Sequence, residues 1–219
     1  MPPYTEKQLQ DLKRNQERLA NLVIMEDRPA FRGGSVTGID VTYSEGVAAV
    51  CAVTINSDTR QTTRIEKQVV EDKSVYIPGF FYLKEGPIIK RILEDLEETG
   101  PVLIDANGVL HPRGLGMASQ IGVELDIQTI GIAKKLHTGS ISQRMGDNAH
   151  VVGNSQEIIG QAVWCPKKKR PYIISIGHRI SLKTAAKVMR KVSNEYGPIP
   201  LRLADRYSRE VIAEIKRGE

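Results

Sequence analysis

The spacing of hydrophobic residues predicts a helix near the start of the chain. Between Leu9 and Val23, leucine and valine recur at helical spacing. Thr5 and Gln8 precede this stretch in the order of a capping box, in which two side chains satisfy free backbone amides of the first turn. We therefore expect an amphipathic helix whose apolar side packs on the core.

Residues 34–72 carry a different pattern, made of short runs rich in β-branched residues. The runs are separated by Ser-Glu-Gly at 44–46 and by Asn-Ser-Asp at 56–58, which are residues typical of turns. This pattern predicts three consecutive antiparallel strands.

Beyond residue 85 the pattern alternates between helical and extended segments. We expect helices at 85–100, 117–126, 181–197 and 200–218, and strands at 101–108, 129–135 and 170–180. Gly100 and Gly218 stand where the first and last of these helices would stop, and Ser181 stands where the third would be capped. Alternation of this kind indicates an α/β fold.

The composition suits one soluble domain covering residues 1–219. The chain has 219 residues, of which 40% are hydrophobic, enough for a single sizeable core. Neither an internal repeat nor a low-complexity linker interrupts it. No apolar run approaches the ~18 residues of a membrane span, and the first residues lack the pattern of a signal peptide. We therefore expect no membrane association and no export. A monomer is expected as well, although nothing in the sequence establishes the oligomeric state.

The charge and the cysteine content of the chain indicate what kind of partner it binds and in which cellular compartment it works. Lysine and arginine number 31 against 26 acidic residues, a formal net charge of +5, which favours an anionic partner such as nucleic acid. Cys51 and Cys165 lie in unrelated contexts without metal-type spacing, so neither a disulfide framework nor a zinc site is expected. A reducing, cytoplasmic location follows.

Three carboxylates lie at the edges of apolar elements: Asp40, Glu85 and Asp105. A carboxylate flanked by core residues is costly to desolvate unless it is paired, hydrogen-bonded or bound to a metal. Each one alone is more easily explained as a structural cap or ion pair. Together they form a set of hard oxygen ligands that suits Mg²⁺ or Mn²⁺, ions that can activate water for phosphodiester hydrolysis. This requires the strands carrying Asp40 and Asp105 to be neighbours.

Four ordered motifs carry a resemblance to a known family. They are GIDVTY at 38–43, YIPGFFYLKEGP at 76–87, DANGVLHPRGLGMASQIG at 105–122 and TIGIAKK at 129–135. In this order and spacing they resemble endonuclease V, the deoxyinosine 3′ endonuclease family. The resemblance implies a ribonuclease H-like α/β fold, with a mixed central sheet flanked by helices.

The resemblance also implies roles for individual residues in catalysis. Asp40, Glu85 and Asp105 match the catalytic metal-binding carboxylates of the family. Lys134 matches a polar position near the water or the scissile phosphate, and Asp205 falls near a C-terminal position at which some relatives carry a further metal-site residue. Mg²⁺ is the implied cofactor, and Mn²⁺ is an alternative.

A second group of residues matches the part of the family that recognises the base. Tyr76 matches an aromatic wedge inserted where the damaged base leaves the stack, although a tyrosine at such a position is more often a core residue. Pro78, Gly79 and Gly108 match the pocket that receives hypoxanthine, where a missing Cβ permits close approach. His111 matches a polar active-site position. Ordinary turns and a structural histidine are the alternative explanations.

Some features depart from the family pattern or stand outside it. Ala-Asn-Gly at 106–108 replaces the more usual Gly-Gln-Gly. Lys84 stands where arginine is usual, so a phosphate contact is retained but the bidentate fork of arginine is lost. The basic run Lys-Lys-Lys-Arg at 167–170 is either a solvated loop or a contact to the nucleic-acid backbone.

The resemblance implies cleavage of inosine-containing DNA, and of inosine-containing RNA as an alternative substrate. The implied cut is at the second phosphodiester bond 3′ to the lesion, leaving 3′-hydroxyl and 5′-phosphate ends. Two other hypotheses remain open: a structure-selective nuclease on the same fold, such as a junction resolvase, and a nucleic-acid-binding module whose acidic residues are structural.

Overall fold

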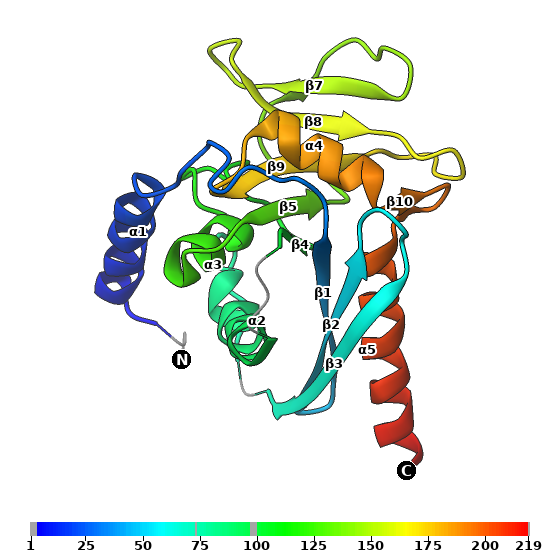
Figure 1. The fold of residues 1–219 in the computed structure, drawn as a ribbon. Helices are drawn as coiled ribbons and strands as arrows, with labels where there is room; N and C mark the ends of the chain where they lie inside the picture. The colour runs from blue at the N-terminus through cyan, green and yellow to red at the C-terminus, as the bar shows by residue number, and fades with distance from the viewer. Residues whose placement is uncertain (1–3, 73, 97–99, 219) are drawn as a thin grey trace.

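The computed structural model describes residues 4–72, 74–96 and 100–218. Its strands are β1 (Ser35–Ser44), β2 (Val47–Asn56), β3 (Thr62–Glu71), β4 (Val102–Ile104), β5 (Thr129–Ala133), β6 (Ser140–Ile141), β7 (Asn148–Val152), β8 (Ile158–Val163), β9 (Tyr172–His178), β10 (Ser193–Asn194) and β11 (Gly197–Pro198). Within the described residues, the first nine form one sheet in the order β3-β2-β1-β4-β5-β9-β8-β7-β6, and the last two form a separate hairpin (Figure 1).

The sheet is mixed, and its centre is parallel. β1, β2 and β3 pair antiparallel, which confirms the three strands predicted between residues 34 and 72. β4 pairs parallel with both β1 and β5, whereas β9 returns antiparallel to β5. The parallel steps require crossover connections, which the helices supply.

Five helices are described: α1 (Glu6–Ala20), α2 (Tyr82–Leu96), α3 (Met117–Leu125), α4 (Leu182–Lys191) and α5 (Ile199–Arg217). α5 lies along β1 and β2 on one face of the sheet, and α4 packs on β8 and β9. α2 and α3 cover the other face, and α1 packs outside α3 (Figure 1). In the described part of the chain no helix has the length and apolarity needed to cross a bilayer.

The hydrophobic core has a layer on each face of the sheet, because alternate strand residues point to opposite sides. One layer joins residues such as Val36, Val53 and Ile130 to α4 and α5. The other joins Ile39 and Ile104 to α2 and α3. Eight consecutive residues of β2 are buried, as expected for a strand covered on both faces.

The predicted ends of the helices are partly confirmed. Thr5 and Gln8 form the capping box of α1, the Ser181 side chain caps α4, and Gly218 ends α5 in a left-handed conformation. α2 begins at Tyr82, earlier than predicted. Its predicted stop at Gly100 follows residues 97–99, which lie outside the described residues.

Two predicted elements were wrong in extent, and five strands, β6, β7, β8, β10 and β11, were missed. The helix predicted to reach residue 197 ends at Lys191, because Asn194 accepts a hydrogen bond from the Tyr196 amide and Gly197 has φ +120°, which together form the β10–β11 turn. The strand predicted at 101–108 is only the three-residue β4. β6, β7 and β8 were not predicted, because their short runs are stabilised by pairing to one another and to β9.

Candidate active site

Asp40 and Asp105 come from neighbouring parallel strands. Ile39 of β1 is the register partner of Ile104 of β4, and each is followed directly by one of the two aspartates. The two aspartates therefore lie at the same height along the paired strands. The pairing of β1 with β4 confirms the predicted adjacency of the two strands. Each strand is buried up to this point, so the carboxylates stand where the core ends.

Glu85 approaches the two aspartates from the first turn of α2. All three carboxylates line one cavity of about 220 Å³, the carboxylate cavity, whose other walls are largely apolar: Ile39, Val41, Phe81, Ile89, Ile104 and Met117. Burial, followed by the negative charge of Asp40, raises the pKa of Glu85 to about 8. Burial also raises the pKa of Asp40. The cavity therefore brings three carboxyl groups together in a poorly solvated place, which disfavours their charged forms.

The donors around this cavity are of the type that Mg²⁺ and Mn²⁺ prefer, namely carboxylate oxygens. Burial and, after it, mutual repulsion raise the pKa values of Asp40 and Glu85, and a cation there would relieve the repulsion. As they stand, however, no three His, Cys, Asp or Glu side chains of the described residues are close enough to hold one ion. The residues fit a hard divalent ion by chemistry, and binding it requires side-chain movement.

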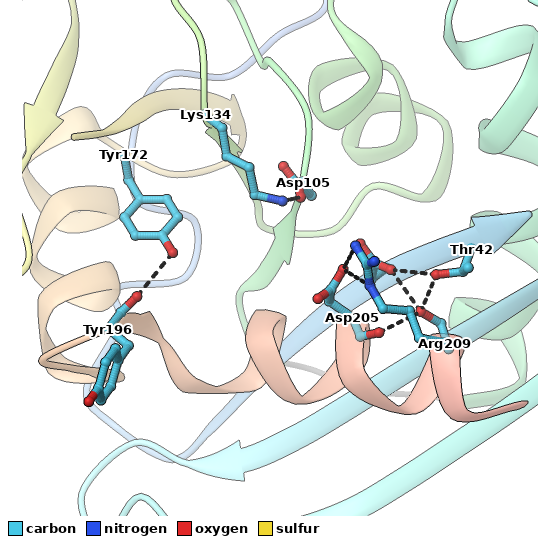
Figure 2. A network of polar contacts seen from close by, with 9 residues as sticks. Thr42, Asp105, Lys134, Tyr172, Tyr196, Asp205 and Arg209 are labelled. Carbon is cyan, nitrogen blue, oxygen red and sulfur yellow. Dashed lines mark hydrogen bonds and ion pairs between the residues drawn. The ribbon is translucent and has the colours of Figure 1, made fainter. Parts of the chain in front are cut away.

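The Lys134 side chain places a positive charge beside the carboxylate cavity. It follows β5 directly and forms an ion pair with Asp105, which is 26% exposed (Figure 2). Burial lowers the pKa of Lys134, but the charge and hydrogen bond of Asp105 outweigh it and raise the pKa overall. Lys134 therefore remains charged near the carboxylates, where it could neutralise a phosphate oxygen.

Asp205 lies on α5, outside the carboxylate cavity. It pairs with Arg209 one turn further along the helix, at 2.8 Å (Figure 2). Its charge raises the pKa of Asp40, so the two are electrostatic neighbours. Asp205 lines a separate cavity of about 390 Å³, the α5 cavity, together with Asp105 and Lys134.

Two hydroxyl residues that the sequence reasoning missed surround Asp40. Ser208 of α5 is fully buried and donates a hydrogen bond to Asp40 at 2.8 Å. Thr42 lies 2.7 Å from the Ser208 hydroxyl. Both positions carried a signal, because Thr42 shares a strand face with Asp40, and Ser208 is a polar residue on the buried side of α5 between Ala204 and Ile212.

The predicted base-recognition residues divide into two groups. Tyr76, Gly79 and His111 line a third cavity of about 490 Å³, the Tyr76 cavity, which also includes Asp105 and Lys134. Tyr76 is 57% exposed there, with its ring 6.0 Å from that of Phe81 in an edge arrangement.

Pro78 and Gly108 are not among the residues that line the Tyr76 cavity. Pro78 is exposed in the turn before α2. Gly108 is buried, and a Cβ at its position would lie 1.9 Å from the Ile176 carbonyl oxygen. The missing side chain of Gly108 therefore permits close packing on β9, where its amide also donates to Ser175 at 2.8 Å.

The Gly79 turn is held by two residues whose roles were not predicted. Gln16 of α1 and Arg113 both donate to the Gly79 carbonyl, at 3.2 and 2.6 Å, and Arg113 also donates to the Gln16 side chain at 2.6 Å. Gln16 is polar but buried. It shares a helix face with Leu12 and Leu19, and a polar residue on an apolar face could have indicated this contact from the sequence. These bonds fix the backbone between Tyr76 and α2.

His111 is neutral at physiological pH. Burial, followed by the charge of Arg113, lowers the pKa of His111 to about 4. Its Nδ1 lies 3.3 Å from the Arg113 amide and accepts a hydrogen bond from it, which assigns the ring proton to Nε2. His111 thus lies beside the Tyr76 cavity as a neutral imidazole, and its ring is already hydrogen-bonded to the Gly79 backbone, which opposes the fall in its pKa.

The fold defines the class of protein. Three antiparallel strands followed by parallel strands and alternating helices, with helices on both faces of a mixed sheet, form the ribonuclease H-like architecture. Residues 17–206 match the endonuclease V family, and the chain belongs to this family. It is an endonuclease and acts on phosphodiester bonds.

Individual relatives cover nearly the whole chain. Endonuclease V of Dictyoglomus thermophilum is 33% identical over 211 residues, which are 94% of this chain and 92% of the relative. The catalytic domain of human endonuclease V superposes with a TM-score of 0.87 at 29% identity, covering 98% of this chain and 99% of that chain. Ciona intestinalis endonuclease V, in complex with a 24mer DNA containing an inosine followed by a ribo-adenosine, gives 0.86 at 26% identity, covering 96% and 100%.

Proposed function

We propose that this endonuclease uses Mg²⁺ to cut DNA at deoxyinosine, hydrolysing the second phosphodiester bond 3′ to the lesion. The observation that carries the proposal is the shared position of Asp105, which lines both the carboxylate cavity and the Tyr76 cavity. The carboxylate cavity, where the cut would occur, thus adjoins the Tyr76 cavity, whose size suits a small ligand group. The inosine-containing DNA bound by the Ciona intestinalis relative supports hypoxanthine as that group.

In the proposed reaction Asp40, Glu85 and Asp105 hold the metal. The bound metal would supply an activated water and charge stabilisation at the phosphate. Lys134 would exchange its partner Asp105 for a phosphate oxygen when the carboxylate turns to the ion. Ser208 donates a hydrogen bond to Asp40 and so orients its carboxylate. No covalent protein intermediate is involved, and the products carry 3′-hydroxyl and 5′-phosphate ends.

Recognition is proposed to occur in the Tyr76 cavity. The exposed Tyr76 ring would fill the gap left by the extruded base, because an aromatic face stacks on neighbouring bases. The Gly79 turn, held by Arg113, forms part of the wall. Neutral His111, hydrogen-bonded to the Gly79 backbone, would form part of the same wall.

Cleavage of inosine-containing RNA is a second candidate. The DNA bound by the Ciona intestinalis relative carries a ribonucleotide directly after the inosine, which supports tolerance of a 2′-hydroxyl near the cut bond. We further propose that residues 1–219 act as one catalytic domain, as a monomer, in the cytoplasm. The two buried free cysteines are consistent with a reducing compartment.

The metal and the cut position can be tested in one experiment. An oligonucleotide with a single deoxyinosine is incubated with the protein in EDTA and then with Mg²⁺ or Mn²⁺ added back. We expect no cutting in EDTA and a product ending at the second bond 3′ to the lesion after Mg²⁺ addition. Cutting in EDTA, or a cut at another bond, would contradict the proposal.

A further inference from the structure

The α5 cavity shares Asp105 and Lys134 with the proposed active site, but its other lining residues have no role in the function proposed above. It lies between the end of β5, the start of β9, the β10–β11 hairpin and the first turns of α5. Its polar lining residues are Asp105, Lys134, Lys168, Tyr172, Asn194, Arg202, Asp205 and Arg206. Four of these side chains are cationic and two are anionic, so the cavity suits an anion.

Lys168 and Arg202 are the cations of this cavity that remain available. Lys134 is paired with Asp105, and Arg206 with Glu210. Neither Lys168 nor Arg202 forms an ion pair with a carboxylate of the described residues, and both are exposed. Lys168 also belongs to the basic run at 167–170, for which the site described so far has no use.

Arg202 is held in place before any ligand arrives. Its guanidinium lies 5.1 Å from the centre of the Tyr196 ring and donates to the Asn194 side chain at 3.1 Å. The Tyr172 hydroxyl donates to the Tyr196 carbonyl at 3.1 Å and so ties the hairpin to β9 (Figure 2). A stacked guanidinium loses less rotamer freedom on binding a phosphate than a free one does.

The order of the cavities gives the direction of a bound strand. Asp105 and Lys134 line both the Tyr76 cavity and the α5 cavity, so these two residues lie where the cavities meet. If the lesion occupies the Tyr76 cavity and the cut falls on its 3′ side, as proposed above, the strand continues into the α5 cavity. We propose that the α5 cavity binds backbone phosphates of the substrate strand on the 3′ side of the cut bond, through Lys168 and Arg202.

Binding measured in EDTA, without turnover, tests this inference. Two single-stranded deoxyinosine oligonucleotides share the same 5′ side, and one has several nucleotides beyond the cut bond while the other has a single one. For Lys168→Ala/Arg202→Ala we expect about tenfold weaker binding of the long oligonucleotide, with the salt dependence reduced by about one phosphate contact per residue. Binding of the short oligonucleotide should stay as in the wild type.

The control variant is Lys13→Ala/Lys216→Ala, which removes the same charge from exposed positions that line none of the three cavities. It should bind both oligonucleotides as the wild type does. Equal weakening of long and short oligonucleotides by the cavity variant, or no weakening of either, would overturn the inference. Failure of the proposed function is a separate result, namely equal wild-type cutting of inosine-free strands.

Discussion

Ser208 on α5 donates a hydrogen bond to Asp40 on β1, with 2.8 Å between the hydroxyl and Oδ2. Ser208 has one proton to give, and the carboxylate is a stronger acceptor than the Asp205 carbonyl at 3.1 Å. The Thr42 hydroxyl, 2.7 Å from that of Ser208, must therefore donate to Ser208. The result is a directed chain of hydroxyls from Thr42 through Ser208 to the carboxylate.

Removing this chain should weaken metal binding before substrate is involved. In Ser208→Ala, Asp40 loses the bond that opposes the rise in its pKa, so metal affinity should fall and the activity profile should shift to higher pH. We expect a loss of about tenfold in Mn²⁺ affinity, measured by calorimetry without substrate. Thr42→Val should have a similar but smaller effect, and Thr42→Ser should restore it. Wild-type affinity and an unshifted profile in Ser208→Ala would show that the bond is only structural.

The two aspartates should be needed for chemistry more than for substrate binding. Asp40→Asn and Asp105→Asn should each lower single-turnover cleavage by about 10³-fold, since each removes a charge from the metal site. Substrate binding in EDTA should persist, because the basic residues remain. Asp95→Asn, at an exposed position on α2, is the matched control. Near-normal turnover by a folded aspartate variant would remove that residue from the catalytic assignment.

Glu85 should make the metal-free protein less stable as the pH rises. The folded protein keeps the Glu85 proton up to a pKa of about 8, whereas the ordinary value is 4.5, so the folded state binds more protons between these values. The free energy of unfolding contributed by this group therefore falls from pH 4.5 to 8. In EDTA, the free energy of unfolding of Glu85→Gln should therefore rise relative to that of the wild type across this pH range. The expected change is on the order of 2 kcal/mol after allowance for solvent access.

Urea unfolding at pH 5 and pH 8.5 measures this difference. Added Mg²⁺ should then stabilise the wild type at pH 8.5 more than it stabilises Glu85→Gln. A difference between the two proteins that does not depend on pH would show that Glu85 titrates normally in the folded state.

Tyr76 separates recognition from chemistry. Its ring is largely exposed, so Tyr76→Ala should cost little stability. If the ring stacks beside an extruded base, Tyr76→Ala should lower affinity for an inosine strand by about tenfold, whereas Tyr76→Phe should retain it. Fluorescence anisotropy with an inosine-free strand provides the comparison. Equal weakening on both strands would point to general backbone contact.

The parts of the site encoded in local patterns were predictable from sequence. Asp40 and Asp105 each end an apolar run, and that alone indicated carboxylates at the edge of a core. The two aspartates lie close together because their strands pair, and this pairing was the one further assumption that the prediction needed.

Features that depend on distant contacts were not predictable. Ser208 reaches Asp40 across 168 positions of sequence, and Gln16 reaches Gly79 across 63. No local periodicity encodes such pairs. Gly108 was expected at a pocket wall, but its backbone packs against Ile176, a contact set by the pairing of β5 with β9.

The most direct test is single-turnover cleavage in Mg²⁺ of four matched substrates, single- and double-stranded DNA and RNA. Each carries one inosine and has an inosine-free control and a size ladder. We expect both DNA forms to be cut at the second bond 3′ to inosine, because a single strand needs no unpairing and a duplex can extrude the base at a cost of a few kcal/mol. Failure to cut either DNA form, or equal cutting of the inosine-free controls, would contradict recognition of deoxyinosine, and cutting of RNA alone would assign the substrate to inosine-containing RNA.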